Sequence, residues 1–290
     1  MQNEQKNSGT FEVFARNPKY VDINEQNVKD WLDIIVKHGT LRVSCVLDIA
    51  SGTGTMVQSF QRKMPATWQP KWICADASED VIQQAKDNVG QSSSQMRFIR
   101  SEADKLSSEL NVSEVIDVAV CGNAIHYMTP ESQLDTMKGI KNILRPGGWF
   151  CFNTTFYGNS RPEETMAFYK EKVKVAMQIL KDKGVVRDKD KHKPEASSFL
   201  PIEHYTDTAR NSGFDIIAVK ETLVETDLQF WLDICGYYDY ASGALHGFGK
   251  EDAADALQAS VKRIFEKYAV GLENKFIPRL WLSVVARSSE

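Results

Sequence analysis

Short apolar runs alternate with amphipathic stretches between about residue 22 and residue 155. The runs are predicted to be strands, and they lie at 43–49, 72–75, 96–100, 116–121 and 149–154. In the stretches between them, apolar residues recur at helical spacing, as at Val81, Ile82 and Ala85. Because several strands are apolar on both sides, the pattern predicts a mostly parallel sheet with helices on both faces.

Local signals indicate where some of these elements begin and end. Asp22 and Glu25 have the spacing of a capping pair, which predicts a helix that begins at Asp22. Ser78 is placed to cap the helix that follows the second strand. A helix is predicted over 130–144, and the proline and glycines at 145–148 are expected to form a turn after it.

The alternation changes after Thr155. A long amphipathic helix is predicted over Pro162–Lys183, and the charged stretch 181–193 is expected to be a solvated, mobile loop. The remaining predicted elements are a short helix at 205–211, a strand at 214–219, an aromatic segment at 230–240, a helix through 254–268 and a strand at 279–286. Two long segments without strands therefore interrupt the second half of the chain.

Composition narrows the range of partners. The chain has 290 residues, of which 42% are hydrophobic, as is ordinary for soluble domains. It carries 35 basic and 39 acidic residues, a formal net charge of −4. Domains that bind nucleic acid are usually basic, so this balance argues against a nucleic-acid partner.

The cysteines and the N-terminal segment indicate the compartment. The five cysteines form no C-x-x-C pair, and four of them lie in apolar runs, so buried reduced thiols and no metal site are predicted. Residues 1–14 lack the basic and apolar regions of a signal peptide. No stretch of about 18 apolar residues is present. A cytoplasmic protein without a membrane partner is therefore expected.

The segment Val46–Gly54 joins a buried strand to a helix through a glycine-rich loop. Gly52 and Gly54 let the backbone approach a ligand, and the following helix N-terminus offers N–H groups. The dinucleotide fingerprint G-x-G-x-x-G would need glycine where Val57 stands, which argues against an NAD-dependent oxidoreductase. Asp48 suits a ligand with a cationic group, such as the ammonium of an amino acid; alternatively it is a structural turn carboxylate.

The stretch Asp48–Gly54 resembles the first motif, D/E-x-x-x-G-x-G, of the class I S-adenosylmethionine-dependent methyltransferases. Further features follow in the family's order: Asp76 after the second strand, Ser101-Glu102-Ala103 for the G-D-A segment, Asn123–Tyr127 after the fourth strand, and Leu144–Gly148 for the L-x-P-G-G turn. The resemblance covers 43–155 and departs from the family at Glu102, where aspartate is usual. It implies an α/β, Rossmann-like, doubly wound seven-stranded sheet, mostly parallel with the last strand antiparallel, with helical cap insertions.

The resemblance also implies a division of the chain and S-adenosyl-L-methionine as cofactor. The predicted parts are an N-terminal lid segment and helix (1–41), a cofactor-binding core (42–156), a helical insertion (157–204), a continuation of the core (205–225), a helical cap insertion (226–275) and a final core strand (276–290).

Twelve residues are predicted to bind the cofactor: Tyr20, Asp48, Ala50, Ser51, Gly52, Gly54, Asp76, Ala77, Glu102, Ala103, Asn123 and Ala124. In this scheme Asp48 holds the ammonium, and Asp76 accepts both ribose hydroxyls. For two of these residues an alternative role is open. Asp76 could instead end a strand or cap a helix, and Tyr20 could pack on the surface rather than form a lid over the ligand.

Methyl transfer from a sulfonium is an in-line displacement, so alignment and exclusion of water are the main requirements. A base is needed only where the nucleophile must lose a proton. His126 follows the fourth strand and is the main candidate for a base or a substrate orienter, with packing as the alternative. Tyr127 and His246 are further catalytic candidates, and His204, Trp231 and Tyr238 are candidates for substrate binding.

The aromatic segment holds five aromatic residues among 230–240. Such a segment forms the core of a cap, and over the strand ends it would also wall a pocket for an apolar or aromatic small molecule. A methyltransferase for such an acceptor is therefore predicted, with O-methylation slightly favoured over N or C. The alternatives are a catalytically silent cofactor-binding subunit and an RNA methyltransferase, which would need a basic face.

Overall fold

The computed structural model describes residues 9–89, 95–110, 115–190 and 199–289. The chain divides into two compact units, which we call the sheet unit and the helical unit. The sheet unit comprises Asp22–Gly158, Phe199–Thr222 and Trp281–Glu290, and the helical unit comprises Met1–Val21, Asn159–Ser198 and Leu223–Leu280. The finer division into six parts stays a prediction.

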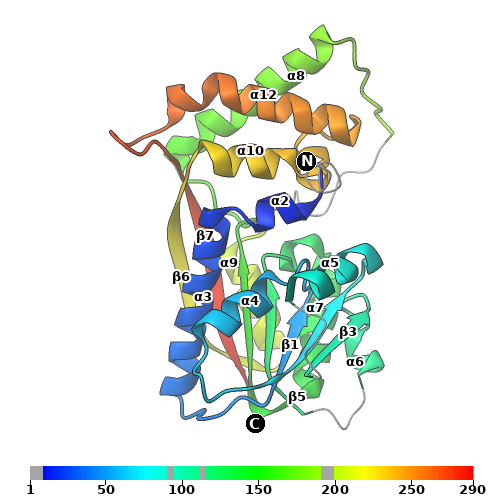
Figure 1. Cartoon of the computed structure of the whole chain (residues 1–290), viewed down its shortest axis with the longest axis vertical. Coiled ribbons are helices and arrows are strands. Elements are labelled where there is room, and N and C mark those ends of the chain that lie inside the picture. The colour runs from blue at the N-terminus through cyan, green and yellow to red at the C-terminus, as the bar shows by residue number, and fades with distance from the viewer. Residues whose placement is uncertain (1–8, 90–94, 111–114, 191–198, 290) are drawn as a thin grey trace. The chain divides into compact units, whose positions relative to one another are not determined.

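Within the described residues, seven strands form one sheet in the order β3-β2-β1-β4-β5-β7-β6 (Figure 1). The strands are β1 (Cys45–Ile49), β2 (Lys71–Asp76), β3 (Met96–Arg100), β4 (Ile116–Gly122), β5 (Leu144–Thr154), β6 (Phe214–Thr226) and β7 (Ile277–Ser288). The first five pair in parallel, and β7 pairs with β5 antiparallel. The predicted seven-stranded sheet with an antiparallel last strand is confirmed.

Helices cover both faces of the sheet, as the alternation of buried residues requires. On one face, α3 (Pro18–Lys37), α4 (Thr55–Lys63) and α5 (Glu79–Val89) pack against side chains such as Val46, Val118 and Cys151. On the other face, α9 (Ile202–Asn211) places the ring centroid of Tyr205 6.2 Å from that of Phe152. Helix α9 contacts α7 (Pro130–Ile143), and α7 contacts α6 (Leu106–Glu109). The carboxyl ends of β1, β2 and β4 therefore meet at one edge of a rigid layer.

The helical unit contains α2 (Phe11–Ala15), η2 (Glu163–Thr165), α8 (Met166–Asp182), α10 (Leu228–Gly236), α11 (Tyr238–Ala244) and α12 (Lys250–Tyr268). The buried stripe of α12, which includes Ala253, Leu257 and Val261, faces α8, α10 and α11. The predicted long helices are present, and the aromatic segment forms α10 and α11. Of the predicted loop 181–193, the first two residues belong to α8, and 191–193 lie outside the described residues.

Several predicted boundaries are wrong; the short helix predicted at 205–211, for example, begins at Ile202. The first long helix begins at Pro18 rather than Asp22, because Asn17 Oδ1 accepts the N–H of Lys19 at 3.0 Å and proline is compatible with a first turn. The strand predicted over 214–219 continues to Thr226 as β6, although several of its later residues are exposed and polar. The predicted cap is confirmed: Ser78 Oγ accepts the N–H of Val81 at 3.4 Å.

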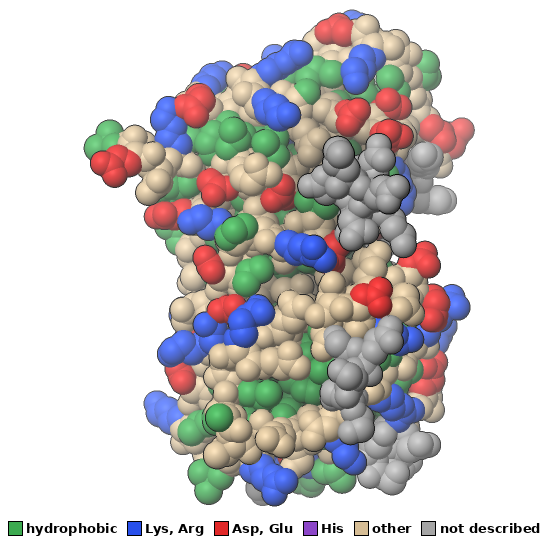
Figure 2. Space-filling view, in the orientation of Figure 1, with side chains coloured by type: hydrophobic (Ala, Val, Ile, Leu, Met, Phe, Trp, Pro, Cys, Tyr) green, Lys and Arg blue, Asp and Glu red, His purple; other side chains and the backbone are tan. Residues whose placement is uncertain are grey.

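Charged side chains of both signs are interspersed on the face shown in Figure 2. All five cysteines are buried, as the apolar runs around four of them predicted. None of the helices in the described ranges is both long enough and apolar enough to cross a membrane.

The segment 145–148, expected to be a turn, belongs to β5. The register changes from Ile116 opposite Leu144 to Val118 opposite Trp149, so β5 carries its extra residues in a bulge. Gly147 has a φ of +67° within it. The proline and glycines therefore mark an irregular strand rather than a turn.

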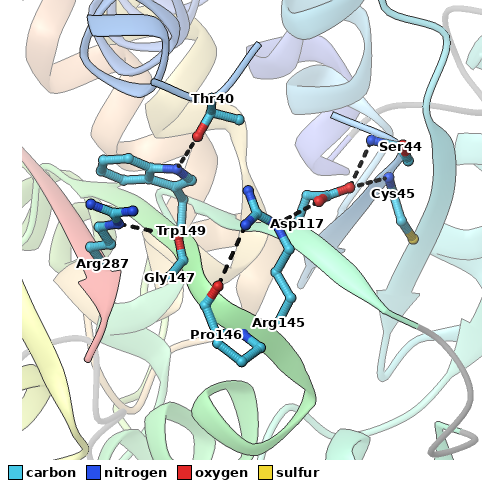
Figure 3. A network of polar contacts seen from close by, with 9 residues as sticks. All are labelled: Thr40, Ser44, Cys45, Asp117, Arg145, Pro146, Gly147, Trp149 and Arg287. Carbon is cyan, nitrogen blue, oxygen red and sulfur yellow. Dashed lines mark hydrogen bonds and ion pairs between the residues drawn. The ribbon is translucent and has the colours of Figure 1, made fainter. Parts of the chain in front are cut away.

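A polar network explains why the bulge is stable (Figure 3). Asp117, in the run predicted to be apolar, accepts a hydrogen bond from Arg145 Nε at 2.7 Å and from the N–H groups of Ser44 and Cys45 at 2.7 and 3.0 Å. Arg287 Nε donates to the carbonyl oxygen of Gly147 at 3.3 Å. One carboxylate thus joins the beginnings of β1, β4 and β5, at the edge opposite the glycine-rich loop.

Candidate functional site

The loop between β1 and α4 has an unusual backbone. Ala50, Gly52 and Gly54 have φ angles of +50°, +55° and +89°. The Ser51 N–H donates to the Ala75 carbonyl of β2 at 2.9 Å, which fixes the loop to the end of the sheet. The loop therefore passes over the carboxyl end of β1 and leads directly into α4.

The two glycines of this loop have different surroundings. A Cβ added to Gly54 would lie 2.5 Å from Cγ1 of Val89 on α5, so only glycine allows this close packing. A Cβ added to Gly52 would have the Ala50 carbonyl oxygen, at 4.0 Å, as its nearest neighbour. Gly54 is thus required by the fold, whereas Gly52 faces open space.

Asp48 lies at the end of β1 and is fully buried. Neither of its carboxylate oxygens has a hydrogen-bond partner among the described residues. Burial raises the pKa of this carboxyl well above its ordinary value, and the negative charge of Asp76 raises it further. A buried carboxylate without a partner is costly, so this site fits a ligand that brings a cationic group.

Asp76, at the end of β2, fixes the loop. Its Oδ2 accepts the N–H of Gly52 at 3.0 Å, and its Oδ1 accepts the N–H of Ser78 at 3.0 Å. Each oxygen of an ionised carboxylate has a further lone pair, so these bonds leave capacity for two more donors. The structural alternative for Asp76 is thus realised, and it is compatible with binding hydroxyl groups.

The segment 101–103 lies beside Asp76, because the Ser101 N–H donates to the Asp76 carbonyl at 3.0 Å. Glu102 and Ala77 are exposed, and Ala103 is half-buried. These three residues and Asp76 therefore occupy neighbouring positions at the ends of β2 and β3.

Asn123 follows β4 with a φ of +50°. Its N–H donates to Asn153 Oδ1 at 2.8 Å, and its own Oδ1 accepts the N–H of Thr155 at 3.1 Å. Asn153 Nδ2 donates to Asn24 Oδ1 at 3.1 Å. The sequence reasoning missed Asn153 and Asn24, although an asparagine within an apolar strand is a usable signal. Together the three amides hold the ends of β4 and β5 in register, with Ala124 directly after them.

His126 is 5% exposed, and its Nδ1 lies 2.9 Å from Thr154 Oγ1. Its ring stacks on Phe156 with centroids 4.2 Å apart. Tyr127, next along the chain, is 48% exposed. The structure therefore fixes the orientation of the histidine and leaves the tyrosine at the surface.

His204 connects two helices of the sheet unit. Its Nε2 lies 2.9 Å from Gln133 Oε1, while Gln133 Nε2 donates to the Met128 carbonyl. Because Gln133 Oε1 is an acceptor, His204 Nε2 is the donor. Burial lowers the pKa of His204, so its ring is a neutral link between α9 and α7 at neutral pH.

The other predicted site residues belong to the helical unit. Tyr20 packs against Phe14 with ring centroids 4.7 Å apart, and it is 2% exposed. The Tyr238 N–H donates to the Gly9 carbonyl at 3.0 Å, and the His246 carbonyl accepts from Arg187. Trp231 is fully buried and faces two basic residues that sequence reasoning missed, Lys172 and Arg279, while a third, Arg161, lies over the ring of Tyr169. The predicted residues therefore form two sets, one in each unit.

An open groove of about 770 Å³ runs along α8 in the helical unit. Its lining, which contains none of the predicted site residues, is Lys170, Val173, Lys174, Met177, Gln178, Lys181, Gly184, Val185, Val186, Arg187 and Phe248. Over the described ranges, no three His, Cys, Asp or Glu side chains come together as a metal site.

Known protein sequences resemble the part of the chain that contains the glycine-rich loop. Residues 46–148 match the family model of a methyltransferase domain. A curated relative, the ubiquinone/menaquinone biosynthesis C-methyltransferase UbiE of Idiomarina loihiensis, is 25% identical over 112 residues. That match covers 38% of this chain and 42% of the relative, so it spans less than half of either protein.

Solved structures share the fold over most of the chain. The protein BH2331 of Bacillus halodurans C-125 has a TM-score of 0.54 at 14% identity, over 89% of this chain and 99% of that one. The cyclopropane synthase MmaA2 of Mycobacterium tuberculosis has a TM-score of 0.52 at 12% identity, over 96% and 88% of the two chains. At these identities the likeness is one of fold.

Proposed function

We propose, from the methyltransferase domain that residues 46–148 form, that this chain is an S-adenosylmethionine-dependent methyltransferase whose acceptor is a small, largely apolar or aromatic molecule. The sheet order and the glycine-rich loop after β1 are those of the class I fold predicted from the sequence. The acceptor and the methylated atom are the parts of this proposal that go beyond the domain match.

The buried carboxylate of Asp48, which has no partner among the described residues, is the observation that carries the proposal. S-adenosylmethionine has an α-ammonium group, which would give this carboxylate the partner that the described residues do not provide. The open space at Gly52 would admit the methionine part, and the remaining lone pairs of Asp76 would accept the ribose hydroxyls. The other residues proposed to bind the cofactor are Tyr20, Ala50, Ser51, Gly54, Ala77, Glu102, Ala103, Asn123 and Ala124.

When bound, the cofactor supplies an electrophilic methyl group on a sulfonium sulfur. The chain then has to hold the acceptor in line and exclude water. His126 is proposed to orient the acceptor or to remove its proton, since Thr154 and Phe156 fix its ring. Tyr127 and His246 remain secondary candidates, and His204, Trp231 and Tyr238 remain proposed substrate contacts.

The net charge of −4 and the interspersed surface charges support a small acceptor over a polyanionic one. O-methylation is kept as slightly favoured, while UbiE is by name a C-methyltransferase. Transfer of a ¹³C-labelled methyl group and the carbon chemical shift of the product would distinguish O-, N- and C-methylation. The cytoplasmic location predicted from the sequence would be tested by fractionation.

Titration calorimetry with S-adenosylmethionine tests the cofactor site. We expect saturable binding by the wild type, a loss of at least about tenfold in affinity for Asp48→Asn, and no change for Asp135→Asn, which removes the same charge from an exposed position of the sheet unit. Binding of NADH without binding of S-adenosylmethionine would refute the proposal. Binding without methyl transfer across a broad acceptor screen would favour the silent cofactor-binding subunit.

A further inference from the structure

Three basic side chains converge on the aromatic residues of the helical unit. Lys172 on α8 is 2% exposed, and its Nζ donates to the Tyr240 hydroxyl at 2.7 Å. The same ammonium lies 4.5 Å from the ring centroid of Trp231. Arg279, at the start of β7, is 3% exposed, and its Nη1 lies 3.2 Å from the Tyr169 hydroxyl.

Arg161 is the third basic member. Its guanidinium carbon lies 4.6 Å from the ring centroid of Tyr169, and that of Arg279 lies 5.8 Å from the same ring. The two arginines therefore contact one aromatic ring, and Lys172 lies 5.4 Å from its centroid. Arg161 is the only one of the three that is partly exposed, so a ligand would approach the cluster from its side.

The cations repel one another at these positions. Burial lowers the pKa of Lys172 to about 8, and the charges of Arg161 and Arg279 contribute to that lowering. Among the described residues, no carboxylate is among the groups that shift the pKa of Lys172. Cation–π contacts stabilise each charge by less than the cost of burying an ion.

Two buried polar groups of the same unit have no hydrogen-bond partner among the described residues. Trp231 Nε1 is fully buried and makes no hydrogen bond among the described residues. The same holds for the Ser160 hydroxyl, next to Arg161 in the chain. Ser160 directly precedes Arg161, and its carbonyl accepts the N–H of Leu280, the residue after Arg279. Indole N–H and hydroxyl groups are donors, like the three cations.

We propose that Arg161, Lys172 and Arg279 form a binding site for the oxyanion, a carboxylate or a phosphate, of a small organic molecule with a flat apolar body. The cations and the two unpartnered donors would satisfy the anion, and the faces of Tyr169 and Trp231 would contact the apolar body. The inference goes beyond the proposed function, because the cluster lies entirely within the helical unit.

The proposal predicts that binding is linked to proton uptake. The groups that surround the Lys172 ammonium are Arg161, Tyr169 of its own helix, Trp231 and Cys235 of α10, Tyr240 of α11, and Arg279 of β7. Burial raises the pKa of Cys235 to about 11 and that of Tyr240 further, so neither titrates near pH 8. An anion raises the pKa of Lys172, so binding at pH 8.5 takes up protons, and affinity falls as the pH rises above about 8.

Calorimetry without S-adenosylmethionine tests the site with benzoate, phenyl phosphate and the neutral analogue benzamide. We expect benzoate or phenyl phosphate to bind at least about tenfold more tightly than benzamide, with proton uptake visible as a dependence on buffer ionisation enthalpy. Tighter binding of benzoate assigns the carboxylate, and tighter binding of phenyl phosphate assigns the phosphate.

Lys172→Met removes the charge and keeps the length of the side chain, and Lys262→Met removes an exposed charge from α12 as its control. We expect Lys172→Met to lose at least about tenfold in benzoate affinity together with the proton uptake, and Lys262→Met to retain both. Equal binding of benzoate and benzamide, no binding of either anion to the wild type, or unchanged binding by Lys172→Met would overturn the proposal. Because S-adenosylmethionine is absent, these outcomes are independent of the cofactor test.

Discussion

At the scale of single residues, the buried carboxylate of Asp48 is costly to the folded protein, and it suits a ligand with a cationic group. Its carboxylate is fully buried, has no hydrogen-bond partner among the described residues, and lies near a second negative charge on Asp76. Interactions of this kind are retained where a ligand offsets their cost. We therefore expect a neutral residue at this position to raise the stability of the ligand-free protein and to lower its affinity for the cofactor.

The first prediction concerns Asp48→Asn without ligand. The carboxyl ionises near pH 3.8 in the unfolded chain and at higher pH in the folded protein. The unfolded state therefore releases the proton first, and the wild type loses stability as the pH rises from about 4 through the folded-state pKa. Asparagine removes this dependence, so we expect Asp48→Asn to be more stable by about 1–3 kcal/mol at pH 7. Urea unfolding at pH 4 to 8 measures the free energy of unfolding of both proteins. A variant less stable than the wild type at pH 7 would contradict the prediction.

The second prediction compares the two glycines of the loop. Gly54→Ala places a Cβ against Val89 and has a φ of +89°, so we expect a loss of about 2–4 kcal/mol in stability. A Cβ at position 52 would have no close neighbour, but the φ of +55° is unfavourable for alanine, so we expect Gly52→Ala to cost about 1 kcal/mol in stability. We expect its loss of S-adenosylmethionine affinity to be larger than that of Gly54→Ala. Thermal unfolding and calorimetry on the pair measure both effects. Equal destabilisation by the two substitutions would contradict this assignment.

At the scale of elements, the strands of the sheet were predictable because burial on both faces makes them apolar runs. The prediction failed at 145–148, where proline and glycines indicated a turn. The path of that segment depends on its register with β4 and on the hydrogen bonds of Asp117, and neither is visible in local sequence. The start of α3 failed for a different reason: Asn17 rather than Asp22 caps it, and the local signal of Asn17 followed by Pro18 was overlooked.

The third prediction tests the network around Asp117. Asp117→Ala leaves the N–H groups of Ser44 and Cys45 without their acceptor and removes the ion pair with Arg145. We expect a loss of about 2–4 kcal/mol in the free energy of unfolding. Arg145→Met removes the ion pair alone and should cost about 1 kcal/mol. Because the network lies at the edge opposite the loop, S-adenosylmethionine affinity should change less than twofold in both variants.

At the scale of the whole molecule, the residues gathered at the carboxyl ends of the strands were easier to predict from the sequence than the basic cluster of the helical unit. Asp48, Gly52, Asp76 and Asn123 each lie at or just after the carboxyl end of a strand, so the topology of a parallel sheet brings them to one edge. The basic cluster has no such rule, because Arg279 comes from a segment of the helical unit that is far along the chain from Arg161 and Lys172. Their convergence depends on how α8, α10 and β7 pack.

The buried cysteines can report the local unfolding of each unit. Burial raises the thiol pKa of Cys121 to about 12 and that of Cys235 to about 11, so neither holds a reactive thiolate at neutral pH. Cys235 belongs to the helical unit, and the other four belong to the sheet unit. Alkylation by iodoacetamide, followed by peptide mass spectrometry, would therefore time the opening of each unit separately.

The fourth prediction is that ligands slow these two reactions selectively. S-adenosylmethionine should slow labelling of Cys74 and Cys121, and benzoate should slow labelling of Cys235, because each ligand stabilises the unit that binds it. Equal slowing of all three by either ligand would mean that the two units open together. The native thiols would then serve as unmodified reporters of cooperativity in this protein.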